Sequence, residues 1–160
     1  MRLISVKNLA ISFQDRLVVD GVSFDLKSQT ITALVGRSGS GKSVIALSII
    51  KLLRNAKISG EIIFQEKNLL TLDESKLSKI RGKEIGFIFQ DPNTALNPLH
   101  KIGKQISEAI TIYNQKISKQ DLNKRIIELL KMVELESLFP RLNDYPHQLS
   151  GGQKQRIMIA

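Results

Sequence analysis

The sequence of 160 residues contains no cysteine. The chain can therefore form neither disulfides nor thiolate metal sites, which is compatible with a reducing compartment. No apolar run approaches the roughly 20 residues needed to cross a bilayer. The N-terminal stretch breaks its apolar run too early for a signal peptide. We therefore expect a cytosolic chain that reaches a membrane only through partners.

Acidic residues are in the minority, with 15 of them against 24 lysines and arginines, so the formal net charge is +9. Such an excess can indicate a nucleic acid or an anionic membrane face as partner. The lysines are scattered along the chain rather than clustered with aromatic residues, and no nucleic-acid recognition signature accompanies them. We interpret the charge as solvated surface and predict no nucleic-acid partner.

The most informative feature that is present is the octet GRSGSGKS, which fits G-x-x-x-x-G-K-[ST]. Backbone N–H groups of such a loop point at a bound phosphate chain. Lys42 can reach the β- and γ-phosphates, and the Ser43 hydroxyl can bind Mg²⁺. The expected nucleotide-binding residues of the octet are Gly36, Arg37, Ser38, Gly39, Ser40, Gly41, Lys42 and Ser43.

The surroundings of the octet favour this interpretation over an ordinary Gly/Ser turn. Residues 30–35 are β-branched and almost all apolar, which predicts a strand buried on both faces. Residues 44–53 are mostly apolar and predict a helix that packs under a sheet. The N-terminus of that helix would add its partial positive charge to the phosphate site.

A second feature, LSGGQ, follows near the end of the sequence and contains Ser150, Gly151, Gly152 and Gln153. One interpretation is an ordinary turn in which Ser150 caps a helix that starts near Gln153. The other is a second anion site, made of a hydroxyl and exposed N–H groups at a helix N-terminus. Two phosphate sites in one chain suggest a nucleotide held from two sides.

GRSGSGKS and LSGGQ, in this order, resemble the Walker A loop and the signature motif of an ABC-type ATPase, and the resemblance covers essentially the whole chain. Domains of this family pair head to tail, with ATP between the Walker A loop of one and the signature motif of the other. The resemblance implies ATP and Mg²⁺ as cofactors and a second ABC ATPase subunit as partner. It further implies that the chain binds transmembrane permease subunits at the cytoplasmic face of the cell membrane. Through these subunits it would act together with a solute-binding protein.

Two more residues match positions of the family. Gln90 follows the apolar run 85–89 and matches the Q-loop glutamine, which approaches Mg²⁺ and the attacking water. We therefore expect Gln90 to be a catalytic residue and, with Ser43, one of two residues at the metal site. Phe13 ends an alternating stretch and resembles the aromatic residue that stacks on adenine. A core phenylalanine at the end of a strand is the alternative for Phe13.

The stretch around and after Gln90 indicates a subfamily within the ABC-type ATPases. FQDP at 89–92 and LNP at 96–98, with Tyr-Pro-His at 145–147, are similar to the ATPases of peptide and nickel importers. Taken alone, these are common turn-forming residues. Their position directly after the glutamine points to a loop that docks on a transmembrane subunit.

The family also requires a Walker B strand ending in Asp-Glu and a switch histidine, both downstream of the signature. The sequence contains neither, because His100 and His147 precede the signature. The family member is an ATP hydrolase, but we expect these 160 residues alone to be inactive.

The expected fold is α/β, a P-loop NTPase of the ABC type without its C-terminal part. It comprises an antiparallel β region at 1–29, a P-loop core at 30–90, a helical subdomain at 91–150 and the start of the signature helix at 151–160. Further expected elements are strands at 60–64 and 84–90, a helix at 73–81 with Asp73 as N-cap, and a helix after a capping box at Ser118. An apolar stripe at helical spacing follows Ser118 and is expected to be core: Leu122, Ile126, Leu129, Leu130 and Val133.

Three other functions stay open at this point. The first is an ABC ATPase of DNA repair or translation, which usually carries long insertions. The second is a different P-loop NTPase with Asp91 as the Mg²⁺ carboxylate. The third is a nucleotide-binding remnant without turnover. The sequence does not identify a transported solute.

Overall fold

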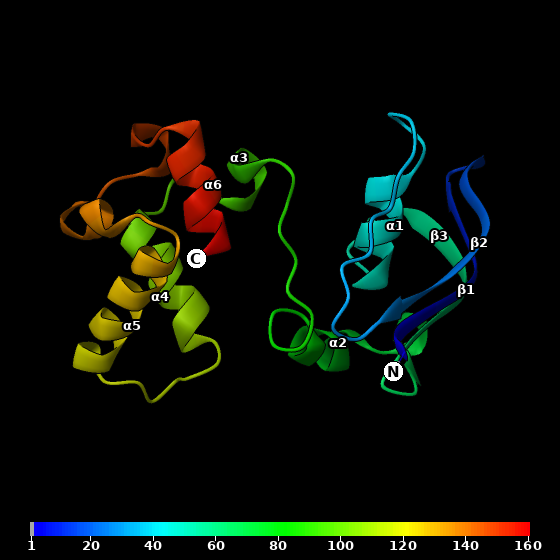
Figure 1. Cartoon of the computed structure of the whole chain (residues 1–160), viewed down its shortest axis with the longest axis horizontal. Coiled ribbons are helices and arrows are strands. Elements are labelled where there is room, and N and C mark those ends of the chain that lie inside the picture. Colours follow the sequence, from blue (N-terminus) through cyan, green and yellow to red (C-terminus); the bar gives the residue numbers. More distant parts are fainter. Residues whose placement is uncertain (1) are drawn as a thin grey trace. The chain divides into compact units, whose positions relative to one another are not determined.

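The computed structural model describes residues 2–160, which form two compact units, one reaching Gly86 and the other running Phe87–Ala160 (Figure 1). Met1, the first residue of the expected β region, lies outside the described residues. Among residues 2–160, no helix combines the length and apolar character that a membrane span requires.

The first unit is built on an antiparallel sheet with strand order β2-β1-β3-β4. Its strands are β1 (Arg2–Phe13), β2 (Arg16–Lys27), β3 (Ala56–Phe64) and β4 (Lys67–Asn68). The alternating N-terminal stretch thus forms one long hairpin, and the strand expected at 60–64 begins four residues earlier. Alternate residues of β1 are buried on each side of a register shift: Ile4 and Val6 before it, and Leu9 and Ile11 after it, are at most 5% exposed.

A bulge between β1 and β3 requires a glycine. The pairing register shifts between Lys7 and Ala10, and Gly60 lies opposite with φ of +99°. A Cβ atom at Gly60 would lie 2.5 Å from the carbonyl oxygen of Asn8 and 2.6 Å from that of Lys7. Only a residue without a side chain fits here.

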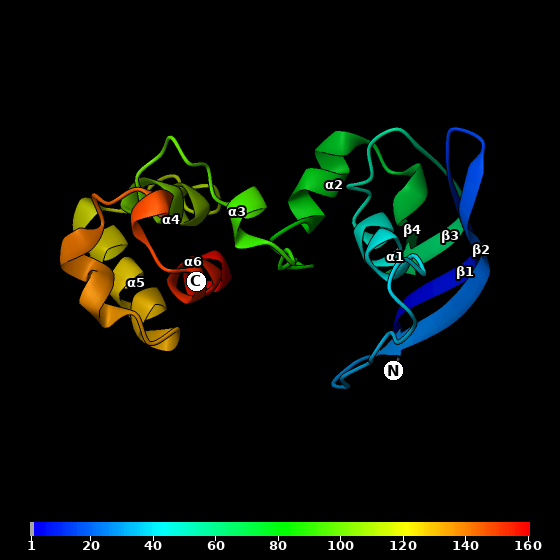
Figure 2. The same ribbon diagram turned by 90° about the horizontal axis from the view of Figure 1, so that it is seen from above.

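Helix α1 (Lys42–Ile49) lies against one face of this sheet (Figure 2). Ile45 joins a core formed by Val6, Leu9, Ile11 and Ile62 of the strands. The single-turn helix η1 (Leu69–Thr71) closes the core through Leu69, which is fully buried. Helix α2 (Glu74–Ile80) follows, and Asp73 is its N-cap as expected, accepting from the Lys76 backbone N–H at 2.9 Å.

Two expected strands do not form, and both predictions were wrong for this chain. Residues 30–35 and 86–89 have no regular secondary structure, although Ile85 makes an isolated bridge to Arg81. Their apolar side chains are exposed: Ile31 is 102% and Val35 85% exposed. A strand needs a neighbour to pair its backbone groups, and the sheet within residues 2–160 ends at β2 and β4.

The second unit is helical, as expected for the region after Gln90. Its elements are α3 (Pro92–Ala95), α4 (Ile102–Thr111), α5 (Lys119–Met132), η2 (Glu136–Arg141), η3 (Pro146–Gln148) and α6 (Gly151–Ile159). Ile102 and Ile106 of α4 pack with Leu130 of α5 and Ile157 of α6. Gly103 permits close packing, because a Cβ there would lie 2.9 Å from Leu142 Cβ.

The start of α5 confirms one half of the expected capping box. The Ser118 hydroxyl oxygen accepts from the Asp121 N–H at 3.1 Å, so Ser118 is the N-cap. The Asp121 carboxylate does not reach back to the Ser118 N–H and instead accepts from the Ser118 hydroxyl at 2.7 Å. Its side chain is one methylene shorter than the glutamate of a full box. The apolar stripe behind it is core, as expected.

Candidate nucleotide site

The phosphate loop leads into α1 with a backbone that suits an anion. Gly39 and Gly41 have φ of +78° and +89°, in the left-handed region that favours glycine. A side chain at Gly41 would also be crowded, since a Cβ would lie 3.1 Å from Val19 Cγ2 of β2. As the N-cap of α1, Gly41 offers no side chain to the first helical N–H groups. These donors therefore remain available to a ligand.

Lys42 stabilises the curvature of this loop. Its ammonium group donates to the carbonyl oxygens of Gly36 at 2.9 Å and of Arg37 at 2.8 Å. Because an ammonium has three N–H donors, one remains for a phosphate oxygen. Gly36 allows this close return, since a Cβ would lie 2.7 Å from Ser40 Oγ. Ser43, the next residue of α1, is exposed.

Phe13 lies at the tip of the hairpin that supports the loop. Val19, which contacts the Gly41 position, pairs with Ile11 of β1. Ile11 and Phe13 point to the same face of β1, two residues apart. Phe13 is half-buried and packs against the core at its edge. The core role is therefore present, while the residue stays partly exposed.

The LSGGQ segment starts α6 with a complete capping box. Ser150 Oγ accepts from the Gln153 N–H at 3.2 Å, and Gln153 Oε1 accepts from the Ser150 N–H at 3.0 Å. The helix starts at Gly151, two residues before the expected Gln153. A Cβ at Gly151 or Gly152 would meet nothing within 4 Å, so the backbone here is open to a partner. The capping interpretation is confirmed, and the box leaves these two N–H groups without a side-chain partner.

Gln90 is exposed and stands directly before a second capped turn. Asp91 is the N-cap of α3, and its Oδ1 accepts from the Asn93 N–H at 2.9 Å. The Asp91 carboxylate is thus used to cap this turn. Nothing in this arrangement favours Asp91 as a magnesium ligand.

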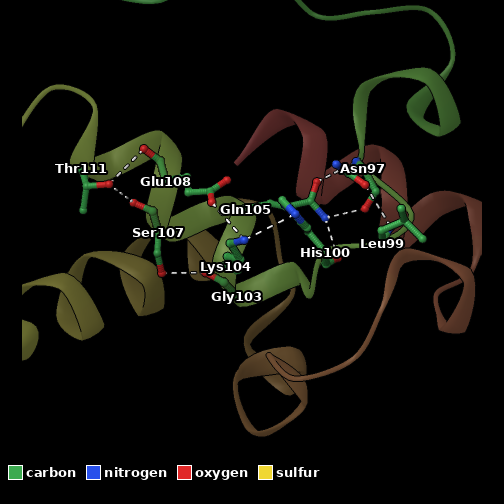
Figure 3. Close-up of polar contacts among 9 residues, drawn as sticks. All are labelled: Asn97, Leu99, His100, Gly103, Lys104, Gln105, Ser107, Glu108 and Thr111. Carbon is green, nitrogen blue, oxygen red and sulfur yellow. Dashed lines mark hydrogen bonds and ion pairs between the residues drawn. The ribbon is translucent and has the colours of Figure 1, made fainter.

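A glutamine that the sequence did not single out holds the loop after α3 in shape (Figure 3). Gln105 Oε1 accepts from the Asn97 N–H at 2.9 Å, and Gln105 Nε2 donates to the carbonyls of Asn97 at 3.0 Å and His100 at 2.8 Å. Asn97 Oδ1 in turn accepts from the Leu99 N–H at 2.9 Å. Leu99 is left 82% exposed at the turn. No local pattern marks Gln105, because its partners lie five and eight residues away.

The oxygen donors at the expected metal positions suit Mg²⁺, which prefers hard oxygen ligands and keeps several waters or phosphate oxygens. Ser43 offers a hydroxyl and Gln90 an amide oxygen. Within residues 2–160, no three histidine, cysteine, aspartate or glutamate side chains come together as a ready metal cage.

The sequence is similar to transport ATPases along nearly its full length. It is 46% identical to the oligopeptide transport ATP-binding protein OppD of Bacillus subtilis and 46% identical to the dipeptide transport ATP-binding protein DppD of Lactococcus lactis. It is 47% identical to the peptidoglycan transport ATP-binding protein YejF of Agrobacterium fabrum. Each match covers 99% of this chain but only 46%, 47% and 30% of the relatives, so the chain spans less than half of their length.

Solved structures share the fold. The ATP-binding cassette MJ0796, a dimer bound to ADP and phosphate, matches with a TM-score of 0.83 and 34% identity over 98% of this chain and 67% of its own. The protein cbiO1 of Clostridium perfringens, part of an ABC transporter complex, matches with a TM-score of 0.75 and 28% identity over 99% of this chain and 59% of its own. These matches confirm the expected ABC-type P-loop fold with its antiparallel β subdomain. The family model described as ABC transporter matches residues 19–160, and the chain therefore belongs to the ABC transporter family.

Proposed function

We propose that this chain binds ATP through the loop 36–43 and forms part of the ATPase subunit of a peptide importer. The observation that carries the proposal is the Lys42 ammonium held over the carbonyls of Gly36 and Arg37, beside the uncapped start of α1. A lysine, left-handed glycines and free helical N–H groups together provide donors and positive charge for a phosphate chain.

The base and metal contacts extend this site. Phe13 would stack on the adenine ring, since it lies on the hairpin that supports Gly41 and is partly exposed. The Ser43 hydroxyl would bind Mg²⁺ together with the β- and γ-phosphates. Gln90 would serve as the glutamine that approaches Mg²⁺ and the attacking water, as the resemblance implies.

Ser150, Gly151, Gly152 and Gln153 would serve the nucleotide of a second ATPase subunit. The open backbone at the two glycines supports this role, because it leaves N–H groups exposed at the start of α6. A related cassette, MJ0796, is a dimer in its solved structure. We therefore propose a head-to-tail pair, in which each subunit closes the site of the other.

Titration calorimetry of ATP on the chain and its Lys42→Ala variant tests nucleotide binding. Charge-assisted bonds to phosphate contribute about 1.5–3 kcal/mol, so we expect at least about a tenfold loss of affinity. Lys67→Ala, an exposed lysine of β4, removes the same charge and should bind like the wild type. Equal affinities of Lys42→Ala and wild type would contradict the assignment.

Hydrolysis by these 160 residues alone should be negligible. They contain no Walker B carboxylates and no switch histidine after the signature, and loss of one general base alone typically costs 10²–10⁴-fold, roughly. A phosphate-release assay with Mg²⁺ tests this directly. Turnover near ~1 s⁻¹, typical of competent enzymes, that disappears in Lys42→Ala would show that other residues do the chemistry.

The loop after Gln90 is the proposed docking surface for a permease subunit. It borders a groove of about 510 Å³ lined by Leu96, Asn97, His100, Gln105, Ile106 and Ile157, among others. The Gln105 hydrogen bonds hold the loop while Leu99 projects outward. A preformed loop with an exposed apolar side chain loses little entropy when it binds.

Uptake measurements in cells that carry the complete transporter test the cargo. The names of the three relatives above mention peptides or peptidoglycan and none mentions nickel. We therefore expect Lys42→Ala in the complete subunit to abolish uptake of labelled peptide and to leave nickel uptake unchanged. Loss of nickel uptake alone would instead identify nickel as the cargo.

A further inference from the structure

The C-terminal end of α1, opposite the phosphate loop, ends in a left-handed residue. Lys51 has φ of +51°, and its N–H donates to the Ser48 carbonyl at 3.0 Å. The Leu52 N–H donates to the Leu47 carbonyl, also at 3.0 Å. These two bonds form a Schellman motif. Neither bond uses the carbonyls of Ile50 and Lys51, which lie at the end of the helix.

Arg81, the residue that ends α2, supplies partners for these carbonyls. Its Nε donates to the Ile50 carbonyl at 2.7 Å and its Nη2 to the Lys51 carbonyl at 2.9 Å, while Nη1 pairs with Glu74. The side chain is 20% exposed. The fixed fork of a guanidinium suits two adjacent carbonyls, and its positive charge lies at the negative end of the α1 dipole.

Lys51 makes a second connection from the same end of α1. Its ammonium group donates to the carbonyls of Leu70 at 2.9 Å and Leu72 at 3.0 Å. Leu70 lies in η1 and Leu72 directly follows it, and buried Leu69 anchors η1 in the core. Two cations thus fasten the end of α1 to the segment 69–81.

Helix α1 depends on such connections because it is short. An isolated helix of eight residues is unstable in water, and within α1 only Ile45 and Ser48 are buried. At the loop end, Gly41 rests on Val18 and Val19 of β2. At the other end, the two cations supply the support.

We propose that Arg81 is a positioning residue for nucleotide binding, which fixes the direction of α1 and thereby the donors at its N-terminus. The inference rests on the proposed ATP site. Arg81 cannot touch the phosphates itself, because the eight residues of α1 place its contacts about 12 Å along the helix from Lys42. Any effect of Arg81 on ATP affinity must pass through the helix.

Three variants of the chain isolate this role. Arg81→Met keeps most of the apolar stem and removes the donors. Arg81→Lys keeps the charge, but an ammonium cannot reproduce the planar fork over both carbonyls. Arg54→Met is the matched control. Arg54 is exposed, follows soon after the end of α1 in the sequence, and makes no hydrogen bond or ion pair in the described structure.

ATP titration of the folded proteins gives the first readout. We expect affinity to fall about tenfold in Arg81→Met and about threefold in Arg81→Lys, because their effect reaches the phosphate donors only through α1. Affinity should stay unchanged in Arg54→Met. A merely structural role would lower the melting temperature without changing the affinity of folded molecules. Wild-type affinity in Arg81→Met, or in Arg81→Lys if the former does not fold, overturns the proposal.

Amide hydrogen exchange without nucleotide gives the second readout. In Arg81→Met the amides of residues 45–49 should exchange about tenfold faster, while those of β1 keep their protection. Failure of the wild type to bind ATP would disprove the proposed function, and exchange then decides separately whether Arg81 holds α1. Equal exchange in wild type and Arg81→Met overturns the inference whether or not ATP binds.

Discussion

Lys154 Nζ donates to Asn93 Oδ1 at 3.0 Å and so joins α6, the signature helix, to α3 across 61 residues of sequence. On the same helix, Arg156 donates to the Val133 carbonyl at 3.1 Å and pairs with Glu134 at 2.8 Å. Cations thus fasten α6 both to the segment after Gln90 and to the end of α5. Ile157 is the buried apolar residue of α6, and these exposed polar contacts add to its attachment.

A double-mutant cycle measures the contact between α6 and α3. Lys154→Met and Asn93→Ala should each destabilise the chain, and the double variant should lose less than their sum. The expected coupling is about 0.5–1 kcal/mol, as for an exposed hydrogen bond to a charged group. Urea denaturation provides the free energies of unfolding. Strictly additive losses would mean that the contact contributes nothing in solution.

Gly60→Ala should destabilise the sheet by about 2–4 kcal/mol, because it combines a positive φ with a backbone clash. A Cβ at this position meets the Asn8 carbonyl at 2.5 Å. Gly21→Ala is the control, with φ of +60° and nothing within 4 Å, and should cost only about 1–2 kcal/mol. Similar losses in both variants would argue against the tight bulge.

The Asp73 cap predicts a pH-dependent stability. Hydrogen bonds from the backbone N–H and then the side chain of Lys76 lower the pKa of Asp73 below its ordinary value of 3.8. A carboxylate with a lowered pKa stabilises the fold above that ordinary value, and the contribution is lost as the pH falls through the folded pKa.

Thermal unfolding of Asp73→Ala tests the direction of this pH dependence. The variant should melt below the wild type near neutral pH, and the gap should shrink once the pH falls below the folded pKa of Asp73. Asp73→Asn caps with an uncharged oxygen, so its difference from Asp73→Ala should vary little with pH. A gap between wild type and Asp73→Ala that stays constant down to strong acid would exclude the carboxylate as the cause.

Ser43→Ala should remove the magnesium dependence of ATP binding. With Mg²⁺ present we expect about tenfold weaker binding than in the wild type, because the metal loses its protein hydroxyl ligand. With a chelator the two proteins should bind alike. Ser38→Ala, in the same loop, serves as control and should keep the wild-type response to Mg²⁺. Calorimetry that shows the same magnesium effect in Ser43→Ala would remove Ser43 from the metal site.

Gln90→Ala in the complete subunit should leave ATP binding nearly intact and reduce the hydrolysis that the assembled transporter stimulates. The glutamine lies at an exposed bend directly before the capped turn of α3. A loop residue can respond to a bound γ-phosphate more freely than a residue within a strand. Hydrolysis rates with and without permease subunits check this, and unchanged stimulation would count against a coupling role.

Features set by neighbours in the chain were predictable from the sequence. The caps Asp73, Ser118 and Ser150 depend on a hydroxyl or carboxylate three residues before an N–H. The phosphate loop needs glycines and a lysine at fixed spacing, and alternating residues were enough to predict antiparallel strands in the region 1–29. Each of these patterns is complete within a few residues.

Features that need distant partners were decided only by the tertiary structure. Residues 30–35 have the composition of a buried strand but stay irregular, because β propensity cannot supply a neighbouring ladder. Arg81 reaches carbonyls 30 and 31 residues away, and no local pattern distinguishes it from a surface arginine. The sequence by itself therefore predicted which residues could hold a phosphate. The fold decided how the helix behind them is held, since that support comes from side chains remote in the chain.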